Sequence, residues 1–214
     1  EAFHAFREEA ERKRFRYFLE VFDPNVDSGI LPEKLGEFIN DQILRTLAGI
    51  AEAGRPDFLK IVYHGPRLME EICQYDPNLI VGVLGGSAGT TYDAFRLLHD
   101  AKKHGARVAL YGRKINNAEH QLAFIEFLRL IAEDTVGPEE AVHAYHGVLQ
   151  GKGITPKLSL EQDLELTEQS MRYSDTGGKP SVAIRNNPLA KRKPRPSATW
   201  PTKPGGTPDF ASMT

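Results

Sequence analysis

A lysine interrupts the apolar run PDFLKIVYHG at residues 56–65. The run is typical of a buried strand, in which successive side chains alternate between two faces. Its more apolar set is Leu59, Ile61 and Tyr63. Lys60 therefore shares the other face with Val62 and His64, and in a closed parallel barrel that face points to the interior. Desolvation there disfavours the ammonium and makes the neutral amine available to form a Schiff base with a carbonyl substrate.

Glu20 is the candidate partner of Lys60. It lies in RFRYFLEVF (14–22), whose aromatic and branched side chains favour a strand. By alternation, Glu20 shares one face of this strand with Phe18 and Phe22. An acid on the neighbouring strand fits a general acid/base beside an iminium, and it equally fits an inert buried ion pair. A solvated position for Lys60 at the end of the barrel is a further alternative.

Two glycine loops predict a phosphate site. The apolar run LIVGVLGG (79–86) continues into GGSAGTT, and we expect the following helix to begin with exposed amide groups. The strand ARVALYG (106–112) ends at a second glycine, followed by Arg113 and Lys114 at the expected C-terminal edge. Barrels often bind phosphate after their last two strands. Either glycine loop alone fits an ordinary turn, whereas two consecutive strands that end in such loops predict one phosphate site.

Strands alternate with helices through most of the chain. We expect strands at 14–22, 58–64, 79–86 and 106–112. We expect helices at 1–13, 32–53, 66–75, 91–104, 118–135, 138–150 and 159–172. Such alternation predicts βαβ units and a parallel sheet.

The composition is that of an ordinary globular protein. Of 214 residues, 40% are hydrophobic and 26% charged, and the net charge of -2 gives no reason to expect nucleic acid or membrane partners. The single cysteine, Cys73, excludes an internal disulfide and is interpreted as a small buried side chain on a helix. With neither a secretory signal nor a long apolar span, the sequence predicts a cytoplasmic protein.

Residues 1–173 carry the periodic patterns, whereas 174–214 are rich in Pro, Gly, Lys and Arg. Such a composition predicts a disordered tail. We interpret its KRKPRP run (191–196) as solvated charge, with a nuclear address or a nucleic-acid contact as the alternatives.

The histidines show no spacing that predicts a metal site. Apart from His4, they lie at positions 64, 99, 104, 120, 143 and 146. We interpret His143 and His146, on one late helix, as surface residues and propose no metal.

The ordered set YFLEVF, FLKIVY, LGGSAGTT and LYGRKI resembles the second half of a class I aldolase barrel, over residues 14–135. It is similar to the tagatose-bisphosphate and archaeal-type fructose-bisphosphate aldolases, and more distantly to deoxyribose-phosphate aldolase. The resemblance implies that Lys60 forms the Schiff base and that Glu20 is the family's fifth-strand glutamate. It also implies that the two glycine loops bind phosphate, without a dissociable cofactor, through Gly85, Gly86, Ser87, Gly112 and Arg113.

The chain departs from this family in length. Only four of the barrel's eight strands are present, and the first half, with its assisting aspartate and lysine, is absent. We therefore predict an α/β fold of the parallel (β/α)8 TIM-barrel type, to which the chain supplies the last four units plus the tail. The implied function is that of an aldehyde-lyase, a class I aldolase that cleaves or forms a phosphorylated ketose in carbohydrate metabolism such as glycolysis.

Two alternatives remain at this point. A half barrel can be a non-catalytic module that binds a phosphorylated ligand, or an inactive fragment. The open edges of a half barrel also invite association with a second copy, as a homo-oligomer.

Overall fold

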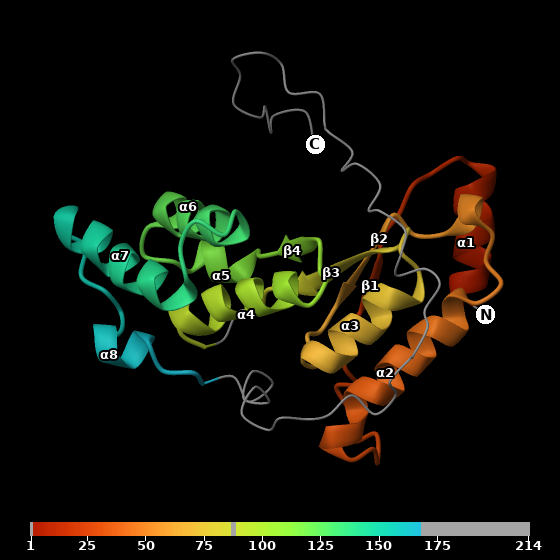
Figure 1. Cartoon of the computed structure of the whole chain (residues 1–214). Coiled ribbons are helices and arrows are strands. Elements are labelled where there is room, and N and C mark those ends of the chain that lie inside the picture. Colours follow the sequence, from red (N-terminus) through yellow and green to blue (C-terminus); the bar gives the residue numbers. More distant parts are fainter. Residues whose placement is uncertain (1, 87–88, 168–214) are drawn as a thin grey trace. The chain divides into compact units, whose positions relative to one another are not determined.

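The computed structural model describes residues 2–86 and 89–167. The elements run α1 (Ala2–Arg12), β1 (Leu19–Val21), α2 (Pro32–Leu47), the 3₁₀ turn η1 (Glu52–Gly54), β2 (Phe58–Ile61), α3 (Pro66–Tyr75), β3 (Ile80–Leu84), α4 (Thr91–Lys103), β4 (Val108–Leu110), α5 (Arg113–Asn116), α6 (Gln121–Ala132), α7 (Pro138–Gly151) and α8 (Leu160–Asp163) (Figure 1). The predicted disordered tail at 174–214, with its KRKPRP run, lies outside the described residues.

The four strands form one sheet in the order β1-β2-β3-β4, and every neighbouring pair is parallel. The register places Glu20 beside Lys60, and Lys60 beside Gly82. The predicted α/β class with a parallel sheet is thereby confirmed. Among the helices of the described residues, none combines the length and apolar character needed to cross a membrane.

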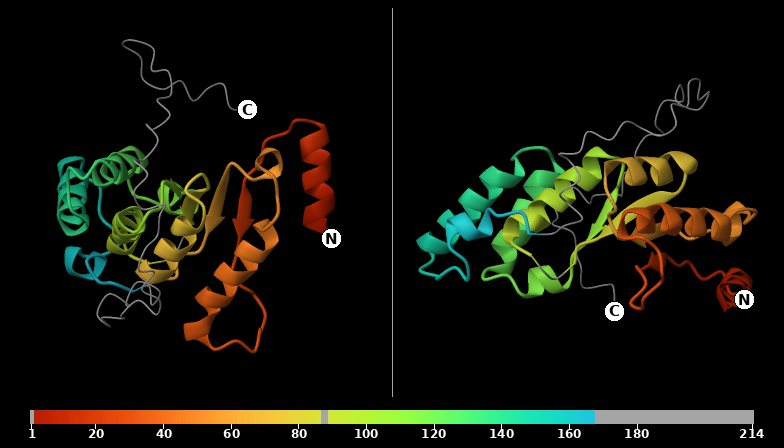
Figure 2. Two further views of the ribbon diagram at one scale, coloured as in Figure 1. Left: turned by 45° about the vertical axis from the view of Figure 1, so that its right-hand side comes forward. Right: turned by 90° about the horizontal axis from the view of Figure 1, so that it is seen from below.

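One face of the sheet is covered by α2 and α3 (Figure 2). Leu59 is fully buried, and Ile61 and Tyr63 are each 3% exposed, as the alternation predicted. The helix residues in the same buried cluster are Ile39, Ile43, Leu47, Met69 and Ile72. Burial of this apolar face is the main force that holds the two helices against the sheet.

A second buried cluster joins α4, α6 and α7. Its centre is aromatic: the ring of Phe124 lies 5.0 Å from that of Phe95 and 5.7 Å from that of Tyr145. Helix α4 contributes to both clusters, through Ala101 to the first and Phe95 to the second. The later helices therefore pack mainly on α4.

The opposite side of the sheet is called here the open face. It consists of Phe18, Glu20, Phe22, Phe58, Lys60, Val62, Ile80, Gly82, Leu84, Val108 and Leu110. No residue of the open face belongs to either buried cluster of the described chain. Phe18 is 46% and Phe22 63% exposed, and the ring of Phe18 stacks on that of Phe58 at 4.8 Å. The two faces thus differ sharply in burial.

Several predicted bounds are wrong. The strand expected at 14–22 is only Leu19–Val21, and Arg14, at the start of the expected range, has a positive φ of 55° that does not occur in a strand. The helix expected to reach residue 53 ends at Leu47, and Gly49 then adopts a positive φ of 75° that a helix cannot accommodate. The short helix α5 was not predicted, whereas α3 has the predicted bounds.

Candidate active site

Lys60 and Glu20 meet on the open face. Their strands are hydrogen-bonded neighbours, and the Nζ atom of Lys60 lies 2.7 Å from Oε1 of Glu20. The predicted juxtaposition is confirmed. The lysine side chain is 20% and the glutamate 27% exposed, so the pair is partly shielded from water. A close carboxylate can accept the proton that an amine must lose before it attacks a carbonyl.

The other neighbour of Lys60 is a glycine. Gly82 pairs with Lys60 across β2 and β3, and its register partner on β4 is Val108. A Cβ atom added to Gly82 would lie 3.0 Å from both the Leu59 carbonyl oxygen and the Val108 Cβ. Residue 82 therefore adds no side chain beside Lys60, and its neighbours on β2 and β4 pack too closely to accommodate one without a shift.

A second pair, which was not predicted, lies at the ends of the same two strands. Nε2 of His64 is 2.8 Å from Oδ1 of Asp23, and the two side chains are 16% and 31% exposed. His64 shares strand parity with Lys60, which was recognised in the sequence. Asp23 follows β1, where alternation no longer predicts direction, so the partner was missed.

The two glycine loops lie at the same edge of the sheet. Leu84 and Leu110 are register partners, and the Gly85 amide donates to the Leu110 carbonyl at 3.0 Å. A Cβ on Gly85 would come 2.3 Å from the Tyr111 ring, so glycine lets this buried ring pack against the loop. The ring's hydroxyl donates to the Ala94 carbonyl at 2.6 Å.

The remaining loop residues are accessible. Gly86 has a φ of 60°, and both Gly112 and Arg113 are exposed. Ser87 lies outside the described residues. The structure thus places Gly85, Gly86, Gly112 and Arg113 in two loops at the same edge of the sheet.

The expectation that the following helix presents free amides is wrong for three of them. The Thr90 amide donates to Asp93 at 2.8 Å, and the Thr91 amide donates to Asp163 at 2.7 Å. The Asp93 amide donates to the Thr90 hydroxyl at 3.1 Å, which completes a capping box. The start of α4 is therefore already occupied by two carboxylates, and these three amides are not available to a phosphate.

The interpretation of His146 as a surface residue is wrong. Its side chain is 11% exposed and its Nε2 lies 2.9 Å from Oδ2 of Asp163, so it is not a surface residue, whereas His143 is exposed as predicted. Within residues 2–86 and 89–167, no group of three or more His, Cys, Asp or Glu side chains is arranged to hold a metal ion.

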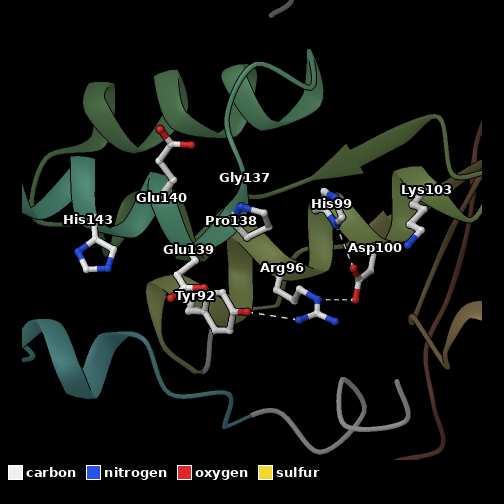
Figure 3. Close-up of a pocket in the computed structure, with 10 residues that line it drawn as sticks. All are labelled: Tyr92, Arg96, His99, Asp100, Lys103, Gly137, Pro138, Glu139, Glu140 and His143. Atoms are coloured by element: carbon white, nitrogen blue, oxygen red, sulfur yellow. Dashed lines mark hydrogen bonds and ion pairs between the residues drawn. The ribbon is translucent and has the colours of Figure 1, made fainter. Parts of the chain in front are cut away.

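A separate hollow lies between α4 and the start of α7 (Figure 3). Arg96 lines it and donates to Asp100 at 2.8 Å and to the Tyr92 hydroxyl at 3.3 Å. His99 contacts the other oxygen of Asp100 at 3.0 Å. These polar groups pair with one another, and no predicted site residue lines the hollow.

No protein-family model matches the chain, and a search of curated proteins finds no match either. The aldolase resemblance therefore depends on the motifs of the chain itself.

Proposed function

We propose that the chain carries the Schiff-base half of a class I aldolase acting on phosphorylated ketoses such as fructose- or tagatose-bisphosphate. The observation that carries the proposal is the 2.7 Å contact between Lys60 and Glu20 on the open face of a parallel sheet. A lysine with an adjacent acid is the pair of groups that imine formation requires.

The chemistry follows from this pair. Glu20 accepts a proton from the Lys60 ammonium, and the neutral amine attacks the ketone carbon C2. A C–N bond forms as the C=O π bond breaks, and the oxygen takes a proton from the nitrogen to become a hydroxyl. Glu20 then protonates the departing hydroxyl, which leaves as water, and an iminium remains. When the C3–C4 bond breaks, its electron pair moves into the iminium and gives an enamine and an aldehyde. This sequence needs no dissociable cofactor.

The loops after β3 and β4 are the proposed phosphate contacts. Arg113 is exposed at the same edge as Gly86, and a guanidinium with nearby backbone donors suits a phosphate group. The open face beneath them supplies Lys60, so the phosphate would orient the ketone over the amine.

The complete fold is proposed to be an eight-stranded barrel to which this chain supplies four strands. In support, all four strands are parallel, and they follow one another in the sheet as in the sequence. The exposed rings of Phe18 and Phe22 suit a barrel interior, which is filled by side chains from the opposite strands.

Borohydride trapping tests the function. The protein is incubated with fructose 1,6-bisphosphate or tagatose 1,6-bisphosphate, reduced, digested and examined by mass spectrometry. We expect an adduct on the peptide that contains Lys60, no adduct in Lys60→Ala, and full activity in EDTA. The matched control is Lys102→Ala on α4, because Lys102 pairs with Asp134 at 2.5 Å away from the open face. This control variant should trap substrate as the wild type does.

Two results would contradict the proposal. Activity that is lost in EDTA, without any adduct, would indicate a metal-dependent aldolase. Binding of a phosphorylated sugar without an adduct or cleavage would instead favour the non-catalytic binding module.

A further inference from the structure

The pair formed by His64 and Asp23 has no part in the steps above. Its two residues follow the strands that carry Glu20 and Lys60, beyond the C-terminal end of each: β1 ends at Val21 and β2 at Ile61. The phosphate loops follow the same ends of β3 and β4, because the sheet is parallel. The histidine therefore lies at the edge of the sheet from which a phosphorylated substrate would approach Lys60.

The backbone around His64 holds the ring in place. Helix α2 approaches so closely that a Cβ on Gly36 would lie 2.6 Å from the Cβ of His64. On either side of His64, Tyr63 is buried in the core and Gly65 turns the chain into α3 with a φ of 105°. The 2.8 Å contact with Asp23 then fixes the orientation of the ring.

The contact also determines which nitrogen is available. An ionised carboxylate can only accept, so Nε2 of His64 donates its hydrogen to Asp23. In the neutral ring Nδ1 is then the acceptor, and it can take up a proton. The imidazolium formed in that step keeps its hydrogen bond to the Asp23 carboxylate.

The position of the pair matches one part of the substrate. A ketose whose C1 phosphate is held after β3 and β4, and whose C2 is bound to Lys60, extends its C4 end toward β1 and β2. His64 follows Lys60 by four residues, beyond the end of β2 and nearer to the edge at which the phosphate loops lie.

We propose that His64, positioned by Asp23, is the base that removes the proton of the C4 hydroxyl during carbon–carbon cleavage. This role rests on the proposed function. The O–H proton moves to Nδ1, a C=O bond forms at C4, and the C3–C4 bond breaks. Its electron pair forms the C2–C3 double bond of the enamine as the iminium nitrogen becomes neutral. In synthesis the imidazolium returns the proton to the aldehyde oxygen.

The test separates the two halves of the reaction. In His64→Gln an amide N–H remains available to Asp23, but the side chain cannot take up a proton. We expect kcat for cleavage of fructose 1,6-bisphosphate to fall by about 100- to 10,000-fold, the usual contribution of a general base. Dihydroxyacetone phosphate has no C4 hydroxyl. Its trapping by borohydride, and the exchange of its carbon-bound hydrogens with deuterium from the solvent, should continue at the wild-type rate.

The matched control is His104→Gln. Nδ1 of His104 lies 2.7 Å from Glu70, so the variant changes a similar pair that joins α4 to α3. We expect cleavage and exchange in this variant to equal those of the wild type.

The outcomes distinguish the role of His64 from the proposed function. Unchanged cleavage in His64→Gln, or loss of exchange together with cleavage, overturns the role of His64 and leaves the Schiff base intact as long as the wild type is trapped. No trapping in the wild type overturns the proposed function, and this role with it.

Asp23 gives a second, independent variant. Asp23→Asn should lower kcat for cleavage at least 10-fold with little change in KM, and Asp23→Glu should recover much of the loss. A purely structural role would instead lower trapping and exchange in proportion to cleavage, which would contradict the assignment of Asp23 as a positioning residue.

Discussion

The two faces of the sheet have opposite properties although they alternate along the same strands. The face under α2 and α3 contains apolar side chains, of which Leu59 and Val83 are fully buried. The open face contains the Lys60–Glu20 pair and exposed aromatic rings. The residues of the covered face therefore provide the stability of the described chain, whereas the alternate residues, on the open face, are available for chemistry.

Two leucines on the central strands test this division. Leu59→Ala, on the covered face, should lower the free energy of unfolding by about 2–5 kcal/mol, because it leaves a cavity in a packed core. Leu84→Ala, on the open face, removes a partly exposed side chain and should cost no more than about 1.5 kcal/mol. Urea denaturation measures both. Equal costs would mean that something outside the described residues covers the open face.

The next prediction concerns ligand binding at the loops after β3 and β4, and its free-energy change is smaller than that of the core substitution. Arg113→Ala should weaken the binding of fructose 1,6-bisphosphate by about 1.5–3 kcal/mol, the range for hydrogen bonds to charged groups. Calorimetry on the Lys60→Ala background measures binding without turnover. Arg129→Ala on α6 is the control, because Arg129 is engaged with Glu126 and Glu133. Equal affinities in Arg113→Ala and the control would place the phosphate elsewhere.

The ion pair on the open face should contribute little to stability. Since Lys60 and Glu20 retain access to water, a double-mutant cycle with Lys60→Met and Glu20→Gln should give a coupling free energy of about 0.2–1 kcal/mol. Denaturation of the four proteins measures this coupling. A value of several kcal/mol would assign the pair a structural role and remove the contrast between the two faces.

The smallest expected effect is the pH dependence of stability that arises from the thiol of Cys73, on the helix α3 that covers the sheet. Cys73 lies on α3, as predicted, and burial, followed by the nearby Glu70, raises its pKa to about 11. The unfolded thiol ionises near the ordinary value of about 8.5. Above that pH the unfolded chain loses its proton first, so stability from this group is present below about pH 8.5 and declines as pH rises toward 11.

Comparison with Cys73→Ala isolates this contribution. The difference in urea midpoint between wild type and variant should shrink from pH 7 to pH 10, and the wild-type thiol should react slowly with disulfide reagents at pH 8. Rapid modification of the folded protein would show that this side of α3 is open to solvent.

Local patterns predicted part of this arrangement. The alternation of apolar residues placed Lys60 and Glu20 on one face, and Pro66 marked the first residue of α3. Contacts distant in sequence were not predictable. The Thr91 amide donates to Asp163, which is 72 residues away in the sequence. This contact uses an amide at the start of α4 that the sequence had indicated as available. The aspartate beside His64 was missed because Asp23 lies beyond the strand, where no periodicity applies.

The order of the strands has a consequence for how the chain folds. Each strand pairs with the strand that precedes or follows it in the sequence, so every pairing closes a loop of modest length. The sheet can grow by one strand–helix unit at a time from β2, α3 and β3, whose two strands are the ones with neighbours on both sides among the described residues. Lys60 belongs to this nucleus, whereas Glu20 is on an edge strand. We therefore expect β2, which carries Lys60, to form before β1 pairs with it and positions Glu20. Hydrogen exchange of the backbone amides should accordingly be slower in β2 than in β1.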